Sequence, residues 1–145
     1  MKINITSKNQ VLELIEKERL IGVMNNTKWN ALFSDLNKVD ELISYRVTYI
    51  DGTTWPDKDS SFSFTSELAQ IWGNFIAMEY LDIDARISHS RGALLEPDII
   101  DYTSKIIDIC SNHSVKMSLS NNWVRVWGYF RQGDEPELYK HITLA

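Results

Sequence analysis

The strongest hydrophobic pattern in the chain lies between Asn74 and Ile83, where only Glu79 and Asp82 are charged. A nearly continuous apolar run of this length is typical of a strand that is buried on both faces. We therefore predict that these residues form the centre of a sheet. Asp84 follows directly, so acidic residues gather where the predicted strand ends.

Three segments have apolar residues at helical spacing. The first covers residues 9–24, and the second begins after Asn25-Asn26-Thr27, residue types that end one helix and cap the next. The third is expected to begin at Pro97, because proline and nearby acidic residues suit the first turn of a helix, and to end at residues 112–113. The apolar stripe of the second helix is Trp29, Leu32, Phe33 and Leu36, and that of the third includes Ile99, Thr103, Ile106 and Cys110.

Alternating apolar and polar residues predict four further strands. Asp51-Gly52 ends the first of them as a turn, and Asn121-Asn122 joins the last two into a hairpin. Residues 66–73 read as an ambiguous short helix, and residues 84–95 as a long connection. The four strands are residues 44–50, 61–65, 115–119 and 123–130.

The order of these elements predicts the fold class. Helices come first, then strands, then one helix and a hairpin, which favours an α+β domain. We expect one domain spanning residues 1–145, with a largely antiparallel sheet of about five strands. Two N-terminal helices and one later helix should pack on it.

Composition indicates the cellular compartment in which the protein works. The chain has 145 residues and one cysteine, and no apolar run approaches the length of a membrane span. The segment MKINITSKNQ has no apolar core of the kind that signal peptides carry. We therefore expect a cytoplasmic protein without contact to a membrane, in which Cys110 is a buried, inert thiol.

Charge is distributed unevenly. The net charge is −5, and residues 50–101 carry ten acidic and three basic side chains, while the segments on either side are close to neutral. Such a field repels phosphate backbones and attracts basic partners. An acidic surface that only maintains solubility is the alternative interpretation.

No catalytic motif stands out. His89, His113 and His141 lack the spacing of metal ligands, and the chain has neither a nucleophile elbow nor a phosphate-binding glycine loop. Asp82 and Asp84 share a strand face and could bridge a divalent cation or act with Glu79 in hydrolysis, but a third ligand is missing. We predict a protein that is not an enzyme and needs no metal or cofactor.

Aromatic residues supply two binding hypotheses. Trp55 lies in a polar, acidic loop, where it either folds back onto the body or anchors a partner. Trp123, Arg125 and Trp127 share one face of the predicted hairpin and could stack single-stranded bases. The negative net charge and the missing basic patch argue against nucleic acid, and burial of this face in the core is the simpler explanation.

Four segments resemble a family of small bacterial proteins. They are Asn25-Asn26-Thr27-Lys28-Trp29, Met78-Glu79-Tyr80-Leu81-Asp82-Ile83, Arg91-Gly92-Ala93-Leu94-Leu95-Glu96-Pro97 and Val126-Trp127-Gly128-Tyr129. The similarity spans about residues 20–130, and Glu96 departs from a pattern that has a second proline. Members of this kind resemble immunity proteins of bacterial toxin systems, including contact-dependent growth inhibition.

This resemblance implies a small cytoplasmic protein that neutralises a basic toxin domain, frequently a nuclease. The matching segments have the character of fold determinants, so the resemblance assigns no catalytic residue. We predict an immunity protein that covers the active site of a cognate toxin's C-terminal domain, with single-stranded nucleic-acid binding as the alternative and a metal-dependent hydrolase third. The predicted toxin-binding residues are Asp51, Trp55, Asp57, Asp59, Glu67, Glu79, Asp82 and Asp84.

Overall fold

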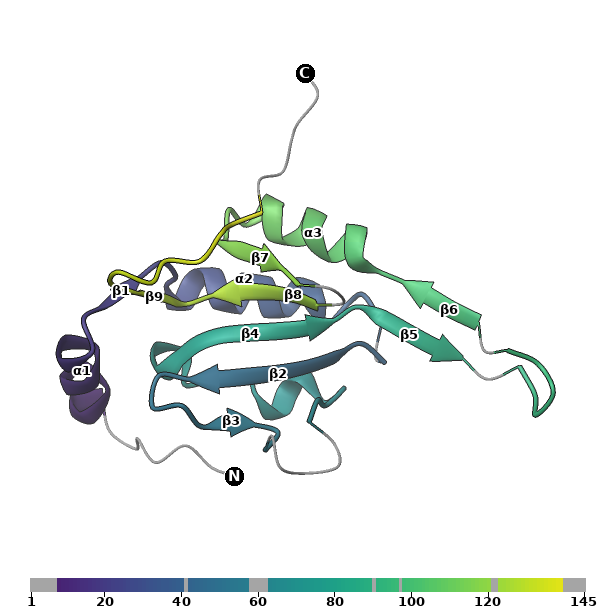
Figure 1. The fold of residues 1–145 in the computed structure, drawn as a ribbon, viewed down its shortest axis with the longest axis horizontal. Helices are drawn as coiled ribbons and strands as arrows, with labels where there is room; N and C mark the ends of the chain where they lie inside the picture. The colour runs from purple at the N-terminus through teal and green to yellow at the C-terminus, as the bar shows by residue number, and fades with distance from the viewer. Residues whose placement is uncertain are drawn as a thin grey trace, which may run out of the picture.

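A five-stranded antiparallel sheet forms the centre of the protein (Figure 1). The computed structural model describes residues 8–40, 42–57, 63–89, 91–96, 98–120 and 123–139. The predicted α+β class is confirmed, and so is the central place of the apolar strand. In spatial order the strands are β3 (Thr54–Trp55), β2 (Ser44–Tyr49), β4 (Met78–Asp84), β8 (Trp123–Trp127) and β7 (Met117–Leu119).

The first helix is shorter than predicted. Helix α1 ends at Lys17 (Lys8–Lys17), and Leu20–Gly22 forms strand β1 instead of a last helical turn. Arg19 has a φ of 54°, which ends the helical conformation between them. The backbone of Leu20–Gly22 pairs instead with β9 (Tyr129–Arg131). Helical periodicity in the sequence does not reveal such a distant partner.

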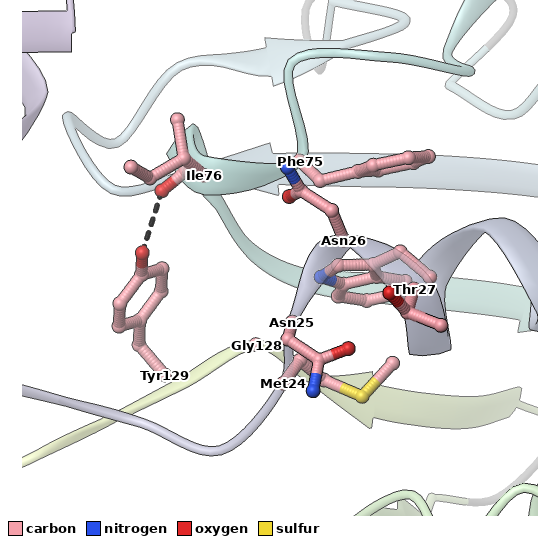
Figure 2. Close-up of a pocket in the computed structure, with 9 residues that line it drawn as sticks. Met24, Asn25, Asn26, Thr27, Phe75, Ile76, Gly128 and Tyr129 are labelled. Atoms are coloured by element: carbon pink, nitrogen blue, oxygen red, sulfur yellow. Dashed lines mark hydrogen bonds between the residues drawn. The ribbon is translucent and has the colours of Figure 1, made fainter.

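The last predicted strand is broken in two at Gly128. The Gly128 N–H donates to the carbonyl of Glu79, and the Tyr129 hydroxyl donates to the carbonyl of Ile76 at 2.7 Å (Figure 2). A Cβ atom at position 128 would overlap the Met78 carbonyl oxygen. Only glycine therefore lets β8 and β9 pass this close to the start of β4.

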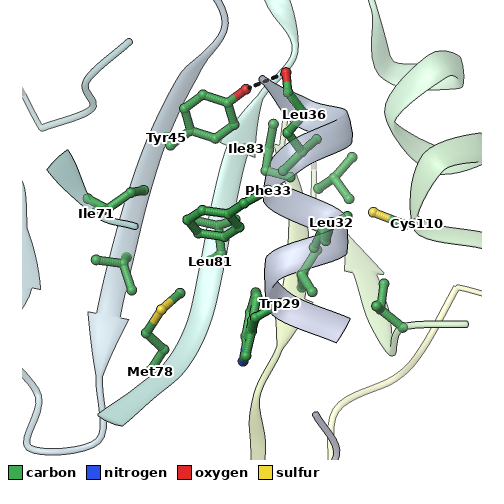
Figure 3. Packing of buried hydrophobic residues seen from close by; sticks show 14 of the residues in the cluster. Trp29, Leu32, Phe33, Leu36, Tyr45, Ile71, Met78, Leu81, Ile83 and Cys110 are labelled. Atoms are coloured by element: carbon green, nitrogen blue, oxygen red, sulfur yellow. Dashed lines mark hydrogen bonds between the residues drawn. The ribbon is translucent and has the colours of Figure 1, made fainter. Parts of the chain in front are cut away.

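Helix α2 (Asn26–Leu36) covers one face of the sheet and supplies much of the core (Figure 3). Asn25 caps it as predicted, because its side chain accepts a hydrogen bond from the Lys28 N–H at 2.8 Å. The predicted stripe is confirmed, since all four of its side chains are buried. They are Trp29, Leu32, Phe33 and Leu36.

Helix α3 begins later than predicted, at Thr103 (Thr103–Asn112). Residues Asp98–Asp101 form strand β6, which pairs with β5 (Arg86–His89), so residues 84–95 are not simply a connection. Ile99 is therefore outside the helix and 57% exposed. Ladder hydrogen bonds across this hairpin outweigh the local helix-start signals, and Pro97 itself lies outside the described residues.

Two other predictions change in detail. The segment before β4 is a 3-10 helix, Phe75–Ala77, so the strand starts at Met78 rather than Asn74. The short helix near residues 66–73 is a 3-10 helix, Leu68–Gln70. In the predicted strand 61–65, the described part contributes one bridge, between Thr65 and Tyr45.

Candidate functional site

One face of the sheet carries a row of three charged side chains. Arg46 on β2, Asp82 on β4 and Arg125 on β8 are direct neighbours across the strands. Figure 1 shows α2 behind the sheet and no helix in front of these strands. We call this the outer face of the sheet.

Asp82 is the buried centre of that row. Its side chain is 0% exposed, and its Oδ1 lies 2.7 Å from Arg125 Nε. Its Oδ2 accepts from Arg125 Nη2 at 3.2 Å and from Arg46 Nη2 at 3.3 Å. Two cations therefore compensate one buried anion, an arrangement that burial of a charge requires.

Aromatic rings hold the Arg125 guanidinium in place. Its carbon Cζ lies 3.9 Å from the centre of the Tyr80 ring and 5.6 Å from that of Trp127. The Trp127 indole N–H donates to Ser118 Oγ at 2.9 Å, which fixes that ring. Burial opposes the charge of Arg125, but the hydrogen bond and the charge of Asp82 outweigh it and raise the pKa of Arg125 above its ordinary value.

Arg46 has a similar setting at the other end of the face. Its Cζ lies 4.9 Å from the centre of the Phe64 ring and 5.3 Å from that of Trp123. Those two rings are 5.0 Å apart. The outer face is thus a layer of arginines and aromatic rings, joined by cation–π contacts and by Asp82.

The structure corrects two predictions about this face. Trp123 and Trp127 are half-buried on the outer face, whereas Val124 and Val126 of the same strand point into the core. Asp82 is not part of an exposed acidic rim, because its carboxylate is enclosed by Arg46 and Arg125. Sequence reasoning noted Arg125 but missed its pairing with Asp82: Arg46 and Arg125 alternate with apolar residues on strands that pair in register with Asp82.

Glu79 is also enclosed rather than exposed. It is 7% exposed, and its two carboxylate oxygens accept from Arg131 at 2.9 and 3.0 Å. The hydrogen bond to Glu79 raises the pKa of Arg131. Acidic residues of the middle third therefore have arginine partners from the segments before and after it, which the linear charge count does not show.

The remaining predicted residues do not form one cluster. Asp51 follows the end of β2 and Asp84 pairs with the start of β2, so they lie at opposite ends of a strand that is about 17 Å long. Trp55 lies opposite Val47 and packs against the core, so it folds back onto the body. Asp57 is half-buried and Glu67 is exposed, and Asp59 lies outside the described residues.

A two-stranded arm, which we define as residues 86–101, extends from the end of β4 (Figure 1). Leu94 is 99% exposed and Leu95 is 60% exposed near its tip. At its base, Trp123 and Ile99 contribute to a hollow of about 260 Å³ between the arm and the outer face. The arm and the outer face thus form one continuous, partly apolar surface.

Groups with catalytic potential are scattered or blocked. Among the described residues, no three His, Cys, Asp or Glu side chains gather closely enough to hold a metal ion. Cys110 is buried as predicted, and burial raises the pKa of its thiol to about 12. The His113 ring contacts the Asp35 carboxylate, with 2.6 Å between Nε2 and Oδ2. No helix of the described chain has the length and apolar character that crossing a membrane requires.

Comparison with known proteins gives one result. Residues 11–133 match the model of a family of unknown function (DUF6678), and the chain belongs to that family. Searches of curated proteins and of solved structures returned no match. The family description assigns no activity, so the resemblance to immunity proteins stays a prediction.

Proposed function

Starting from this family membership, we propose that the protein is a cytoplasmic immunity protein that binds and neutralises the C-terminal domain of a cognate toxin. The partner is a basic domain, in keeping with the net charge of −5. The protein acts by covering the toxin's active site and performs no catalysis. Residues of the arm and the outer face provide the contact.

The exposed arm is the observation that carries this proposal. Leu94 and Leu95 are exposed to solvent near the tip of a hairpin of which, among the residues whose burial the structure describes, only Ile87 is buried in the core. Exposed leucines at adjacent positions of a projecting element favour a protein partner over a solvent role. The adjoining half-buried Trp123 supplies the kind of aromatic anchor that dominates binding energy in protein interfaces.

Charge on this surface favours a basic partner. Arg46 and Arg125 share the single negative charge of Asp82, and Arg131 is bound to Glu79, so most of their positive charge is offset within the protein. Glu96, Asp98 and Asp101 of the arm are exposed. A basic cleft would therefore meet acidic side chains around an apolar centre, which speeds association and selects the partner.

A protection assay tests this proposal. The cognate toxin is sought in the neighbouring gene, and a large secreted protein with a variable C-terminal domain there supports the proposal. Cells that express that domain are then challenged with Leu94→Ser/Leu95→Ser and with a matched control, Leu12→Ser, which changes another exposed leucine. We expect the arm variant to bind at least about tenfold more weakly and the control to protect fully.

Charge reversal provides a second test of the proposal. Glu96→Lys together with Asp98→Lys on the arm should weaken binding of a basic toxin, most strongly at low salt. A housekeeping neighbour in the genome counts heavily against the proposal. Full protection by both the arm variant and the charge-reversal variant, with affinity insensitive to salt, contradicts the proposed surface.

The alternative function is single-stranded nucleic-acid binding on the outer face. Tyr80, Trp123 and Trp127 are half-buried rings beside arginines, as base-stacking platforms require. Engagement of Arg46 and Arg125 by Asp82 leaves less positive charge for phosphates. Binding of single-stranded DNA and RNA at low and moderate salt separates the two functions, because tight, salt-sensitive binding that is lost in Trp123→Ala favours the alternative.

A further inference from the structure

A cavity of about 480 Å³ lies at the first turn of α2 (Figure 2). Neither a residue of the arm nor Arg46, Asp82 or Arg125 of the outer face lines it. Residues 24–27, 29, 75–76 and 128–129 contribute its walls, so three distant segments of the chain meet there. The volume is in the range of small-molecule sites. Met24, Phe75 and Tyr129 make much of the wall apolar.

The start of α2 presents free hydrogen-bond donors to this cavity. The Asn25 side chain and carbonyl accept from the N–H groups of Lys28 and Trp29. Within the described part of the chain, no group accepts from the N–H of Asn26 or Thr27. Such first-turn amides carry the partial positive charge of the helix dipole.

Trp29 adds a buried donor of a different kind. The residue is 2% exposed, and its ring stacks on Phe75 at 6.1 Å. Its Cζ2, the atom beside the N–H-bearing edge, would lie 3.2 Å from a Cβ at Gly128, another cavity residue. Figure 3 places the ring nitrogen at the end away from Leu32.

No described residue accepts from this indole N–H, although Trp29 is only 2% exposed. Its nitrogen is not among the fully enclosed side-chain atoms without a partner, which are Arg46 Nε, Thr48 Oγ1, Trp55 Nε1 and Ser111 Oγ. The small exposed part of Trp29 therefore includes this nitrogen, and the residue lines the cavity. An unpartnered donor on an almost wholly buried side chain that opens to the cavity is the independent sign that the helix start is a binding site.

The charges around the cavity define the ligand. None of its lining residues is Lys, Arg, Asp or Glu. The carboxylate of nearby Glu79 is bound to Arg131, so it does not repel an anion there. Two backbone amides and one indole N–H suit the two oxygens of a singly charged carboxylate, whereas a phosphate dianion calls for a basic side chain.

We propose that this cavity binds a small monocarboxylate with an apolar, preferably aromatic, body. The carboxylate accepts from the N–H groups of Asn26, Thr27 and Trp29. The body packs against Phe75, Tyr129 and Met24. This binding is independent of toxin neutralisation.

Titration of the isolated protein with benzoate and phenylacetate tests the proposal by the nitrogen-15 resonances of the indoles. We expect a saturable shift of one indole signal, assigned to Trp29 by its loss in Trp29→Phe. Benzamide, the neutral analogue, should shift it at least about tenfold more weakly, because one charge-assisted hydrogen bond is worth that factor. Trp72→Phe is the control, since that indole donates to Asn30 instead.

Two variants at position 26 test the same proposal if Trp29→Phe fails to fold. Asn26→Pro deletes one donor at the first helical position, where proline is favoured, and Asn25 at φ −139° and ψ 171° tolerates a following proline. Asn26→Ala keeps the donor and should bind benzoate as the wild type does, while Asn26→Pro should bind about tenfold more weakly. Equal affinity of the two variants, an equal response to benzamide, or no saturable shift overturns the proposal.

Discussion

Asp82 on β4 and Arg125 on β8 form a shorter ion pair than Asp82 and Arg46, with 2.7 Å rather than 3.3 Å between the paired atoms and no exposure of the Asp82 side chain. The pair joins the two strands at the middle of the sheet. Arg125 binds both carboxylate oxygens, and Arg46 adds a second hydrogen bond to Oδ2 at 3.3 Å.

Asp82→Asn should destabilise the protein by about 3 kcal/mol, because it leaves two arginines without their anion in a partly buried layer. Urea unfolding followed by circular dichroism measures this. Asp84→Asn, two residues along the same strand face, is the matched control and should change stability by less than about 0.5 kcal/mol. Equal effects of the two substitutions contradict the central role of Asp82.

Gly128→Ala should be among the most harmful small substitutions, because its methyl group would overlap the Met78 carbonyl and press on Trp29. We expect a loss of about 3 kcal/mol in the free energy of unfolding. Gly22→Ala on the paired strand meets only the Tyr129 ring at 3.6 Å and is the control. A Gly128→Ala protein as stable as Gly22→Ala would show that β4 and β8 can separate freely.

Asn25→Ala should cost about 1 kcal/mol, because the Lys28 N–H loses its acceptor, and Asn25→Gly should cost only a few tenths of that amount. Thermal unfolding of the three proteins provides the comparison. If alanine and glycine are equivalent, the side-chain cap contributes nothing to α2.

Cys110 should make the protein less stable in alkali. Burial raises the pKa of its thiol from 9.0 to about 12. The buried, protonated thiol therefore contributes fully to the free energy of unfolding below pH 9. That contribution is lost, at about 1 kcal/mol per pH unit, as the pH rises from 9 toward 12. Burial also raises the pKa of Tyr45 and Tyr49, which act in the same direction. Stability profiles of wild type and Cys110→Ala isolate the thiol, since the variant should show a shallower decline, and parallel profiles would contradict the assignment.

Local patterns predicted the elements whose partners are local. The stripe from Trp29 to Leu36 and the Asn25 cap are properties of one helix, and the structure confirms both. Leu20–Gly22 and Asp98–Asp101 were predicted as helix because their strand partners, β9 and β5, are not visible in the segment itself. Tertiary pairing decided these two segments against their local preference.

The candidate site was less predictable for a related reason. Asp82 was singled out as an acidic residue at a strand end, but its meaning depends on Arg46 and Arg125, which lie 36 and 43 residues away. Register across three strands is needed to bring them together. The exposed leucines of the arm were hidden for the same reason, since residues 84–95 appeared to be a connection.

The pairing of β1 with β9 joins residues more than 100 positions apart. During synthesis on a ribosome, Leu20–Gly22 emerges more than 100 residues before its partner Tyr129–Arg131. The central strand β4 likewise needs β8 to close its second edge. The nascent chain must therefore carry unpaired strand edges until residues 123–131 have left the exit tunnel.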